Sequence, residues 1–225
     1  MDDDARPTRQ QISDAVDPSG WSLILGAVYA EVLAPSLVAA TEVASVSVSA
    51  AGADGQGHLT VDIRADRAVL RLQSAGVGGV TGRDVRLAHA VSEALTAQGW
   101  QPSQAGGAAQ ALEIAIDALD IGLVRPFWEA ILGYADEPGS ELPAALIDPS
   151  GRGPAVWFQQ MDAPRPQRNR IHVDVDLPAE GAAARIDAAL AAGGRLLSDD
   201  AAPAYWVLAD PEGNEACVCT WQGRD

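Results

Sequence analysis

The sequence has few cysteines and no long apolar run. Only two of its 225 residues are cysteine, Cys217 and Cys219. They stand two apart in an expected strand, so both side chains point the same way and a disulfide framework is not expected. No run of about 18 apolar residues occurs, which predicts that no transmembrane helix is present. The opening residues, MDDDARPTRQQ, are acidic and polar, unlike a secretory signal, and we expect a cytoplasmic protein.

Basic side chains are also scarce. The chain has 15 Lys and Arg against 31 Asp and Glu, which gives a net charge of -16 at pH 7. A charge of this sign argues against nucleic acid and against anionic membrane surfaces as partners. It is compatible with a cationic ligand, although such a charge more often serves solubility. Apolar residues make up 48% of the chain, enough for one large core or two smaller ones.

A stretch of small and polar residues divides the chain. The segment from Gln101 to Gln110, QPSQAGGAAQ, lacks helical or strand periodicity and is typical of a linker. About a hundred residues lie on each side, a common domain size. We therefore expect one domain over residues 8–100, a linker over 101–110 and a second domain over 111–225.

The first domain is expected to alternate helices and strands. HLTVDIRA and AVLRLQSA are typical strands, because Leu59, Val61 and Ile63 alternate with polar residues. Thr81 is placed to cap a helix, with Asp84 in its first turn near the positive end of the helix dipole. The expected segments are a helix at 8–16, one strand-like run at 22–33, a helix or mixed segment at 35–46 and a helix at 83–98.

This order resembles the pterin-4a-carbinolamine dehydratase family, an α+β fold, over most of residues 8–100. The family has a His-His-Pro motif, a Thr-His pair, and then Gly-Gly-Leu-Thr followed by Asp. The resemblance places the second histidine on His58, and it places the last motif on Gly78, Gly79, Val80 and Thr81, with the Asp on Asp84. Gly57, Leu59 and Ala75 stand where the family has His, Pro and His. Dehydration needs groups that transfer protons, so we expect a degenerate site and no useful dehydratase activity. His58 is expected to be a surface or turn residue, and His89, within the last helix, to have a structural role.

The second domain contains two strand–helix patterns. LEIAIDALD precedes an apolar-faced helix at 121–132, and strands are expected at 144–147 and 155–160. RIHVDVDLP, an Ala-rich helix and YWVLADPEGNEACVCT follow, with DPEGN as a turn. The Phe127-Trp128 and Leu132-Gly133 pairs and the DPEGNE motif resemble the vicinal-oxygen-chelate family of glyoxalase-like and bleomycin-resistance-like proteins. The resemblance implies two βαβββ-type modules that form a cupped sheet.

The resemblance also implies a metal site. The ligand positions of the family fall on Glu113, His172 and Glu215, with Gln159 as a fourth ligand and Gln160 as its alternative. His172 and Glu215 are each expected at the centre of a strand. Each of the three ligands is expected on the face of its own strand that lies opposite a row of apolar residues. One imidazole and two carboxylates suit Fe, Mn, Ni or Zn.

Three functions remain open for this chain. The first is a glyoxalase-like metal-dependent lyase or isomerase that acts on a small oxygen-rich substrate, with Glu113 or Glu215 as base and with Trp157 and Trp206 lining the ligand pocket. The second is a non-catalytic protein that binds or sequesters a small molecule, as in bleomycin resistance. The third is a degenerate pterin-binding protein that acts as a dimerisation or regulatory module. A small-molecule ligand is expected throughout, and a homodimer is compatible with all three.

Overall fold

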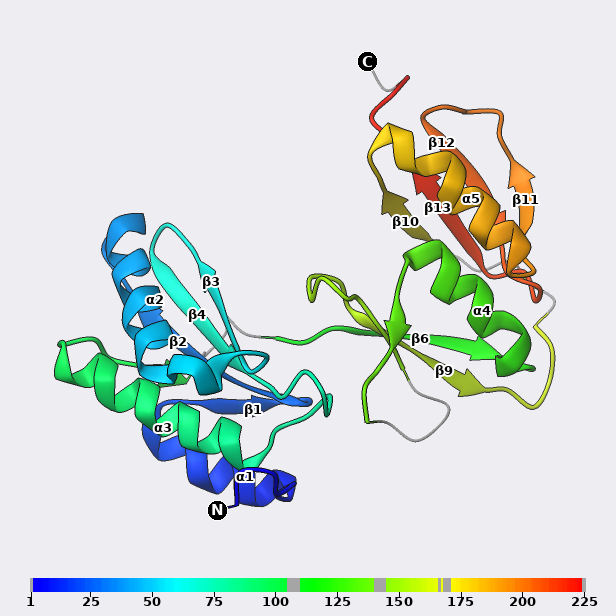
Figure 1. The fold of residues 1–225 in the computed structure, drawn as a ribbon. Helices are drawn as coiled ribbons and strands as arrows, with labels where there is room; N and C mark the ends of the chain where they lie inside the picture. The colour runs from blue at the N-terminus through cyan, green and yellow to red at the C-terminus, as the bar shows by residue number, and fades with distance from the viewer. Residues whose placement is uncertain (1, 105–109, 140–144, 166, 168–170, 224–225) are drawn as a thin grey trace. The chain divides into compact units, whose positions relative to one another are not determined.

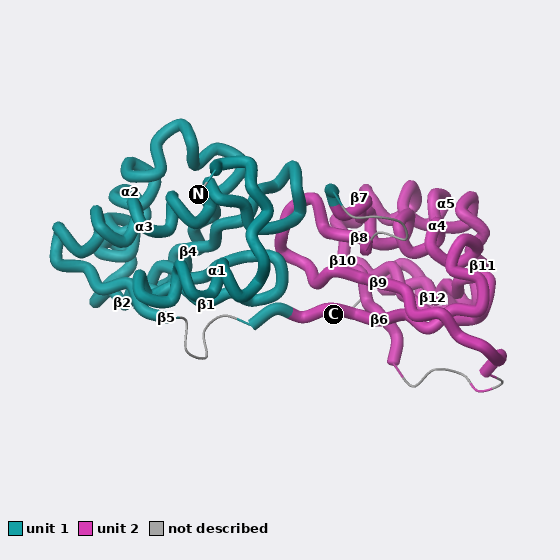
Figure 2. Tube along the Cα trace, turned by 90° about the horizontal axis from the view of Figure 1, so that it is seen from below, with its two compact units in different colours: residues 1–111, 138–140 teal, residues 112–137, 141–225 magenta. Residues whose placement is uncertain are grey.

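The chain forms two compact units. The computed structural model describes residues 2–104, 110–139, 145–165, 167 and 171–223. Unit 1 consists of residues 1–111 and 138–140, and unit 2 of residues 112–137 and 141–225 (Figure 2). In the described part of the chain, no helix is long and apolar enough to cross a membrane.

Unit 1 is an antiparallel sheet covered by helices (Figure 1). The strands run in the order β1-β2-β4-β3, and β5 pairs with β2. The elements are α1 (Arg9–Val16), η1 (Asp17–Ser19), β1 (Ser22–Ile24), β2 (Ala27–Leu33), α2 (Leu37–Ala51), η2 (Gly52–Gly55), β3 (Leu59–Ile63), β4 (Arg67–Leu72), α3 (Gly82–Ala97) and β5 (Ser103–Gln104).

One face of this sheet forms the core of unit 1. Val28, Ala30 and Val32 alternate along β2 and are fully buried, as are Leu70 and Leu72 of β4. They pack in one apolar cluster with residues of α1, α2 and α3. The alternate apolar residues of these strands therefore form the face of the sheet that packs into the core.

Helix ends in unit 1 follow the expected capping chemistry. Thr81 and Asp84 form a capping box at the start of α3, with the Asp84 carboxylate accepting from Thr81 N at 2.7 Å. Two expected boundaries are wrong. The run 22–33 is a hairpin, β1 and β2, because the chain turns at Leu25, whose φ is 51°. The helix or mixed segment expected at 35–46 is helix α2, which continues to Ala51. It ends there because the next residue, Gly52, adopts a φ of 54°.

The expected linker is only partly without secondary structure. Ser103 and Gln104 form β5 by backbone pairing with Glu31 and Ala30 of β2. Backbone pairing needs no apolar side chains, so the polar composition of the segment did not indicate it. Residues 105–109 lie outside the described residues.

Unit 2 contains the two expected βαβββ modules (Figure 1). The first is β6 (Glu113–Ala118), α4 (Ile121–Leu132), β7 (Ala135–Asp136), β8 (Leu146–Ile147) and β9 (Ala155–Gln160). The second is β10 (Val173–Asp176), η3 (Ala179–Gly181), α5 (Ala182–Ala191), β11 (Arg195–Ser198), β12 (Tyr205–Ala209) and β13 (Glu215–Cys219). In each module the first strand runs parallel to the last, β6 beside β9 and β10 beside β13. Residues 140–144 and 168–170, at the edges of two expected strands, lie outside the described residues.

The two modules share one core and are joined through the DPEGN turn. Phe127 and Ile131 of α4 and Ala189 of α5 belong to one buried cluster. Asp210 is fully buried, and its carboxylate accepts from Trp128 Nε1 of the first module at 3.0 Å. Glu212 accepts from the backbone N–H groups of Leu119 and Asp120, at 2.8 and 2.7 Å, just before α4. Hydrogen bonds from the first module to Asp210 and Glu212 of this turn therefore connect the two modules.

Candidate functional site

The sheet of the second module presents one polar face. Val173 of β10 and Ala216 and Val218 of β13 pack into the core. The residues between them, Asp174 and Cys217, point to the opposite face because side chains alternate along a strand. These two residues are direct partners in the parallel β10–β13 pair. The register of this pair therefore builds the site.

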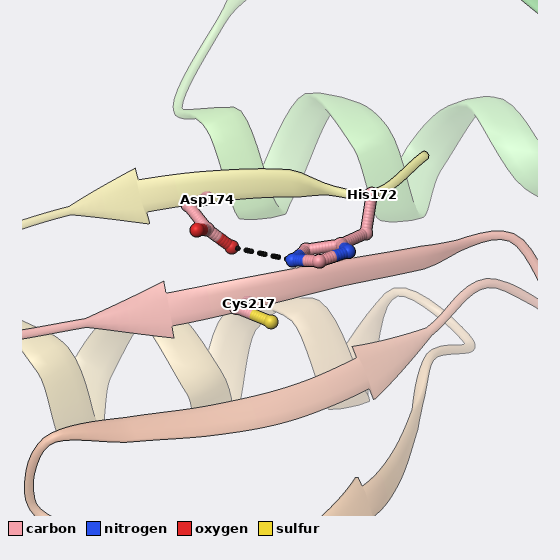
Figure 3. Close-up of side chains that lie close together, drawn as sticks. All are labelled: His172, Asp174 and Cys217. Atoms are coloured by element: carbon pink, nitrogen blue, oxygen red, sulfur yellow. Dashed lines mark ion pairs between the residues drawn. The ribbon is translucent and has the colours of Figure 1, made fainter. Parts of the chain in front are cut away.

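Three side chains able to bind a metal ion meet on this face. The ligand atoms of His172, Asp174 and Cys217 all lie within 4.8 Å of one another (Figure 3). His172 Nε2 is 3.2 Å from Asp174 Oδ1, and the side chains of both residues are about half exposed, at 51% and 54%. Cys217 is buried, at 6%. The thiol thus forms the floor of the cluster, and the imidazole and carboxylate form its rim.

The environment of the thiol holds it in the neutral form. Burial raises the pKa of Cys217 to about 12, and a hydrogen bond to Asp174 and the charges of Asp174 and Glu215 act in the same direction. At neutral pH the thiol therefore keeps its proton, and its S–H donates a hydrogen bond to the Asp174 carboxylate. Cys217 is not a free nucleophile, but a cation that displaces the proton would gain a thiolate ligand.

The first-module ligands expected from the sequence do not join this cluster. In the described residues, His172, Asp174 and Cys217 form the one group of three or more metal-binding side chains, and Glu113 is not in it. Glu113 instead lies near Glu137, whose pKa is raised by burial and then by the charge of Glu113. Gln159 is paired with Asp117, four residues along β6 from Glu113, which corresponds to roughly 13 Å. The Gln160 side chain donates a hydrogen bond to the backbone carbonyl of Leu119 at 2.8 Å, which is a structural contact.

Cys217 and Asp174 are the ligand-type residues that sequence reasoning missed. Glu215 is the first residue of β13 and His172 precedes β10, so neither lies at the centre of its strand as expected. Cys217 holds the central position of β13. The shared face of Glu215 and Cys217 was visible in the period-two pattern. The distances between ligand atoms, all within 4.8 Å, show that Cys217 joins His172 and Asp174.

The two tryptophans expected in the ligand pocket lie on different faces. Trp157 of β9 is 39% exposed and alternates with the buried Val156 and Phe158, so it lies on the open face of the first sheet. Trp206 of β12 is paired with Val218 and packs against the buried core. The β12–β13 register therefore places Trp206 on the core side of its sheet, and its role in a ligand pocket stays a prediction.

In unit 1, His58 contacts the carboxylate of Asp84. His58 Nδ1 is 2.7 Å from Asp84 Oδ1, and the two side chains are 12% and 0% exposed. Thr81 Oγ1 donates to the other carboxylate oxygen of Asp84 at 2.8 Å. His58 lies in the turn before β3, as one of the two expected alternatives has it, and its side chain is mostly buried. Its neighbours Gly57 and Ala75 are joined by a backbone hydrogen bond from Ala75 N to Gly57 O of 2.9 Å.

Comparison with known proteins identifies the domain that carries the cluster. Residues 113–219 match the family model of the glyoxalase-like domain. The chain thus contains a glyoxalase-like domain in its second half, which includes His172, Asp174 and Cys217. A search of curated proteins gave no match.

Several solved structures are similar to about half of the chain. A glyoxalase/bleomycin resistance protein/dioxygenase family enzyme from Burkholderia phytofirmans PsJN shares 18% identity, with a TM-score of 0.40, over 48% of this chain and 95% of its own. A glyoxalase-related enzyme from Fulvimarina pelagi has 18% identity and a TM-score of 0.40 over 49% and 87%. The fosfomycin resistance protein FosX from Listeria monocytogenes, complexed with Mn(II) and sulfate, has 11% identity and a TM-score of 0.40 over 50% and 90%.

Proposed function

We propose that the glyoxalase-like domain binds a divalent cation through His172, Asp174 and Cys217 and uses it to hold neighbouring oxygens of a small molecule. One observation carries the proposal, the placement of three different donor atoms within 4.8 Å of one another. The match of residues 113–219 to the glyoxalase-like domain supports it.

The donor set fits zinc better than the other ions expected from the sequence. Zinc ligands lie about 2.0–2.3 Å from the ion, so tetrahedral ligand atoms are roughly 3.5 Å apart. Donor atoms within 4.8 Å reach that spacing by small rotations, since His172 and Asp174 are half exposed and free of tight packing. A soft thiolate beside imidazole and carboxylate favours zinc over the hard Mn(II), while Fe and Ni remain compatible with the imidazole.

The residues around the cluster suggest how a ligand is handled. A bound cation of this kind would supply Lewis-acid stabilisation of negative charge on a substrate oxygen. Asp174 orients the imidazole of His172 through their 3.2 Å contact. Glu215 lies on the same face of β13 as Cys217 and is the candidate group to accept a proton from the ligand. The corresponding reaction class is a lyase or isomerase reaction that begins with proton abstraction.

Metal binding is tested on the purified full-length chain. Zinc titrated by calorimetry into chelator-treated protein is expected to bind at one site per chain. His172→Ala should weaken binding at least tenfold, because one ligand is lost. Asp176→Asn changes a carboxylate further along β10 and is the matched control. Equal affinity of wild type and His172→Ala, or no binding by wild type, contradicts the proposal.

A non-catalytic binding protein is the second candidate. The separation of Glu113 from the cluster favours it, because one of the two expected bases is then absent from the site. Zinc-loaded protein incubated with hydroxyacetone in D₂O distinguishes the two. A proton-abstracting enzyme exchanges the α-hydrogens above the rate of the Glu215→Gln variant, whereas a binding protein leaves them at the background rate.

For unit 1 we propose a dehydratase-like fold without dehydratase activity, retained as an assembly or regulatory module. The order of its helices and strands, which is the basis of the resemblance, supports the proposal. Gly57 and Ala75 provide no group that transfers a proton, and loss of one such group costs about 10²–10⁴-fold in rate. A carbinolamine dehydration assay well above background, and sensitive to His58→Ala, would contradict this proposal.

A further inference from the structure

A cavity of about 550 Å³ that is open to solvent lies at the surface of unit 1; His58 does not line it, and Asp17 and Glu93 at its edge are exposed. It is formed where η1, the later turns of α3 and the segment Gln101–Pro102 meet. The volume falls within the range typical of small-molecule sites. Its lining residues are Asp17, Pro18, Ser19, Gly20, His89, Ser92, Glu93, Thr96, Gln101 and Pro102.

The wall of this cavity is held by buried hydrogen bonds. Ser92 Oγ accepts from the indole N–H of the fully buried Trp21 at 2.8 Å and donates to Ser19 O at 2.9 Å. Gly20 has a φ of 82°, and a Cβ there would lie 2.5 Å from Pro102 O, so only glycine allows the two segments to approach so closely. These contacts fix η1 against α3 and preform the cavity.

His89 contributes a polar group to the cavity. Its Nδ1 is 2.7 Å from Ser19 Oγ. Among the described residues, no hydrogen-bond partner is found for Nε2, and His89 lines the cavity. The ring is therefore oriented by one nitrogen and offers the other to a ligand. The structural role expected for His89 thus accounts for only half of its hydrogen-bonding capacity.

The electrostatics of the cavity favour a cation. Asp17 and Glu93 line it, and no arginine does. Within the described residues neither carboxylate forms an ion pair, and the chain contains no lysine. α1 ends at Val16 and α3 ends at Ala97, so two helix C-termini, with their partial negative charge, are close to the same lining. A positive charge bound there would interact favourably with the partial negative charge of both helix C-termini and with the two carboxylates.

We infer that this cavity binds a small organic amine in its ammonium form. The N–H groups of the ammonium would donate to Glu93 and Asp17, and His89 would hydrogen-bond to a neighbouring polar group of the ligand. Pro18 and Pro102 offer apolar surface for a short carbon chain. The inference concerns a site separate from the metal cluster and does not depend on it.

The test compares three probes of similar length on the full-length, chelator-treated chain at about 0.15 M salt, where long-range attraction to the net charge is screened. The probes are 1,4-diaminobutane, n-butylamine and the neutral n-butanol. Amide NMR shifts upon titration are expected to follow a saturable curve for both amines, but not for butanol, and to cluster at Ser19, His89 and Glu93.

Variants separate the site from general attraction to an acidic protein. Glu93→Gln is expected to weaken amine binding roughly tenfold, since a charge-assisted hydrogen bond is lost. Glu42→Gln removes the same charge from an exposed position on α2, outside the cavity, and should leave binding unchanged. Equal weakening by both variants, shifts that map elsewhere, or binding of butanol as tight as that of butylamine overturns the inference.

Discussion

At the scale of single residues, Asp210 links the DPEGN turn to helix α4 of the first module. Its buried carboxylate accepts from Glu212 N, from the backbone and side-chain amides of Asn214 and from Trp128 Nε1, all within 3.0 Å. Four donors compensate for the cost of burying the charge. The DPEGN motif therefore has a structural role that is separate from any chemistry on the open face.

Removing this carboxylate is expected to destabilise unit 2. Asp210→Ala leaves the donors of Trp128 and Asn214 without their acceptor, which should lower the free energy of unfolding by about 3 kcal/mol. Asp187→Ala on the exposed face of α5 should change it by less than about 0.5 kcal/mol. Urea denaturation of both variants measures the difference. A loss at Asp210 no larger than that at Asp187 would show that the turn does not fasten the modules.

The candidate site also shows what a sequence pattern leaves open at this scale. Period-two alternation placed Glu215 and Cys217 on one face of a strand, and His172 and Asp174 on one face of another. It did not fix how the two strands pair, because a shift of two residues preserves every face. The β10–β13 register sets Cys217, not Glu215, beside Asp174. The face was predictable from the sequence, while the ligand set required the structure.

At the scale of elements, local signals in the sequence predicted two helix ends, whereas strand pairing was harder to predict. The Thr81–Asp84 capping box and the Gly133 end of α4 follow from residue chemistry within one turn. β5 was missed, since its pairing with β2 depends on residues far apart in the sequence. The face on which Trp206 lies also depends on a distant pairing, the register of β12 with β13.

The turn between β8 and β9 is organised by Asp148. Its carboxylate accepts from Ser150 Oγ at 2.7 Å and from the N–H groups of Ser150, Arg152 and Gly153. Partial burial opposes ionisation of Asp148, but these hydrogen bonds outweigh it and lower its pKa to about 2. The ordinary value is 3.8. The charged carboxylate is thus the form that the turn requires.

This lowered pKa predicts a pH dependence for the turn. The stabilising contribution of Asp148 is fully present above pH 3.8, the ordinary value, and is lost as the pH falls towards 2. NMR titration of the carboxyl carbon should give a midpoint near 2 for Asp148, below the ordinary value of 3.8. A midpoint for Asp148 at its ordinary value of 3.8 would mean that the turn does not form as described.

At the scale of the whole molecule, the two units have separate apolar cores. The buried cluster of unit 1 draws on α1, α2, α3 and the β2–β4 sheet, and that of unit 2 on α4, α5 and both small sheets. Chain segments that each enclose their own apolar core can fold as separate units. The proposed cation site lies wholly in unit 2, and the proposed amine cavity wholly in unit 1.

A fragment of residues 112–225 is therefore expected to fold alone and to bind zinc. Its zinc affinity should agree with that of the full chain within about a factor of two, because all three ligands are present. Circular dichroism, cooperative urea unfolding and zinc calorimetry on the fragment are the measurements. If the fragment is insoluble or unfolds without cooperativity, the two units depend on each other for folding, and the proposed domain boundary is wrong.

The most direct test of the account is whether Cys217 ligates a metal ion. Cobalt(II), a spectroscopic substitute for zinc, should bind the chelator-treated chain and give an intense thiolate-to-cobalt charge-transfer band in the near ultraviolet. Cys217→Ser should abolish the band, while Cys219→Ser, the neighbouring buried cysteine on the same face of β13, should retain it. A wild-type spectrum without the band, or a band lost only in Cys219→Ser, would contradict the proposed site.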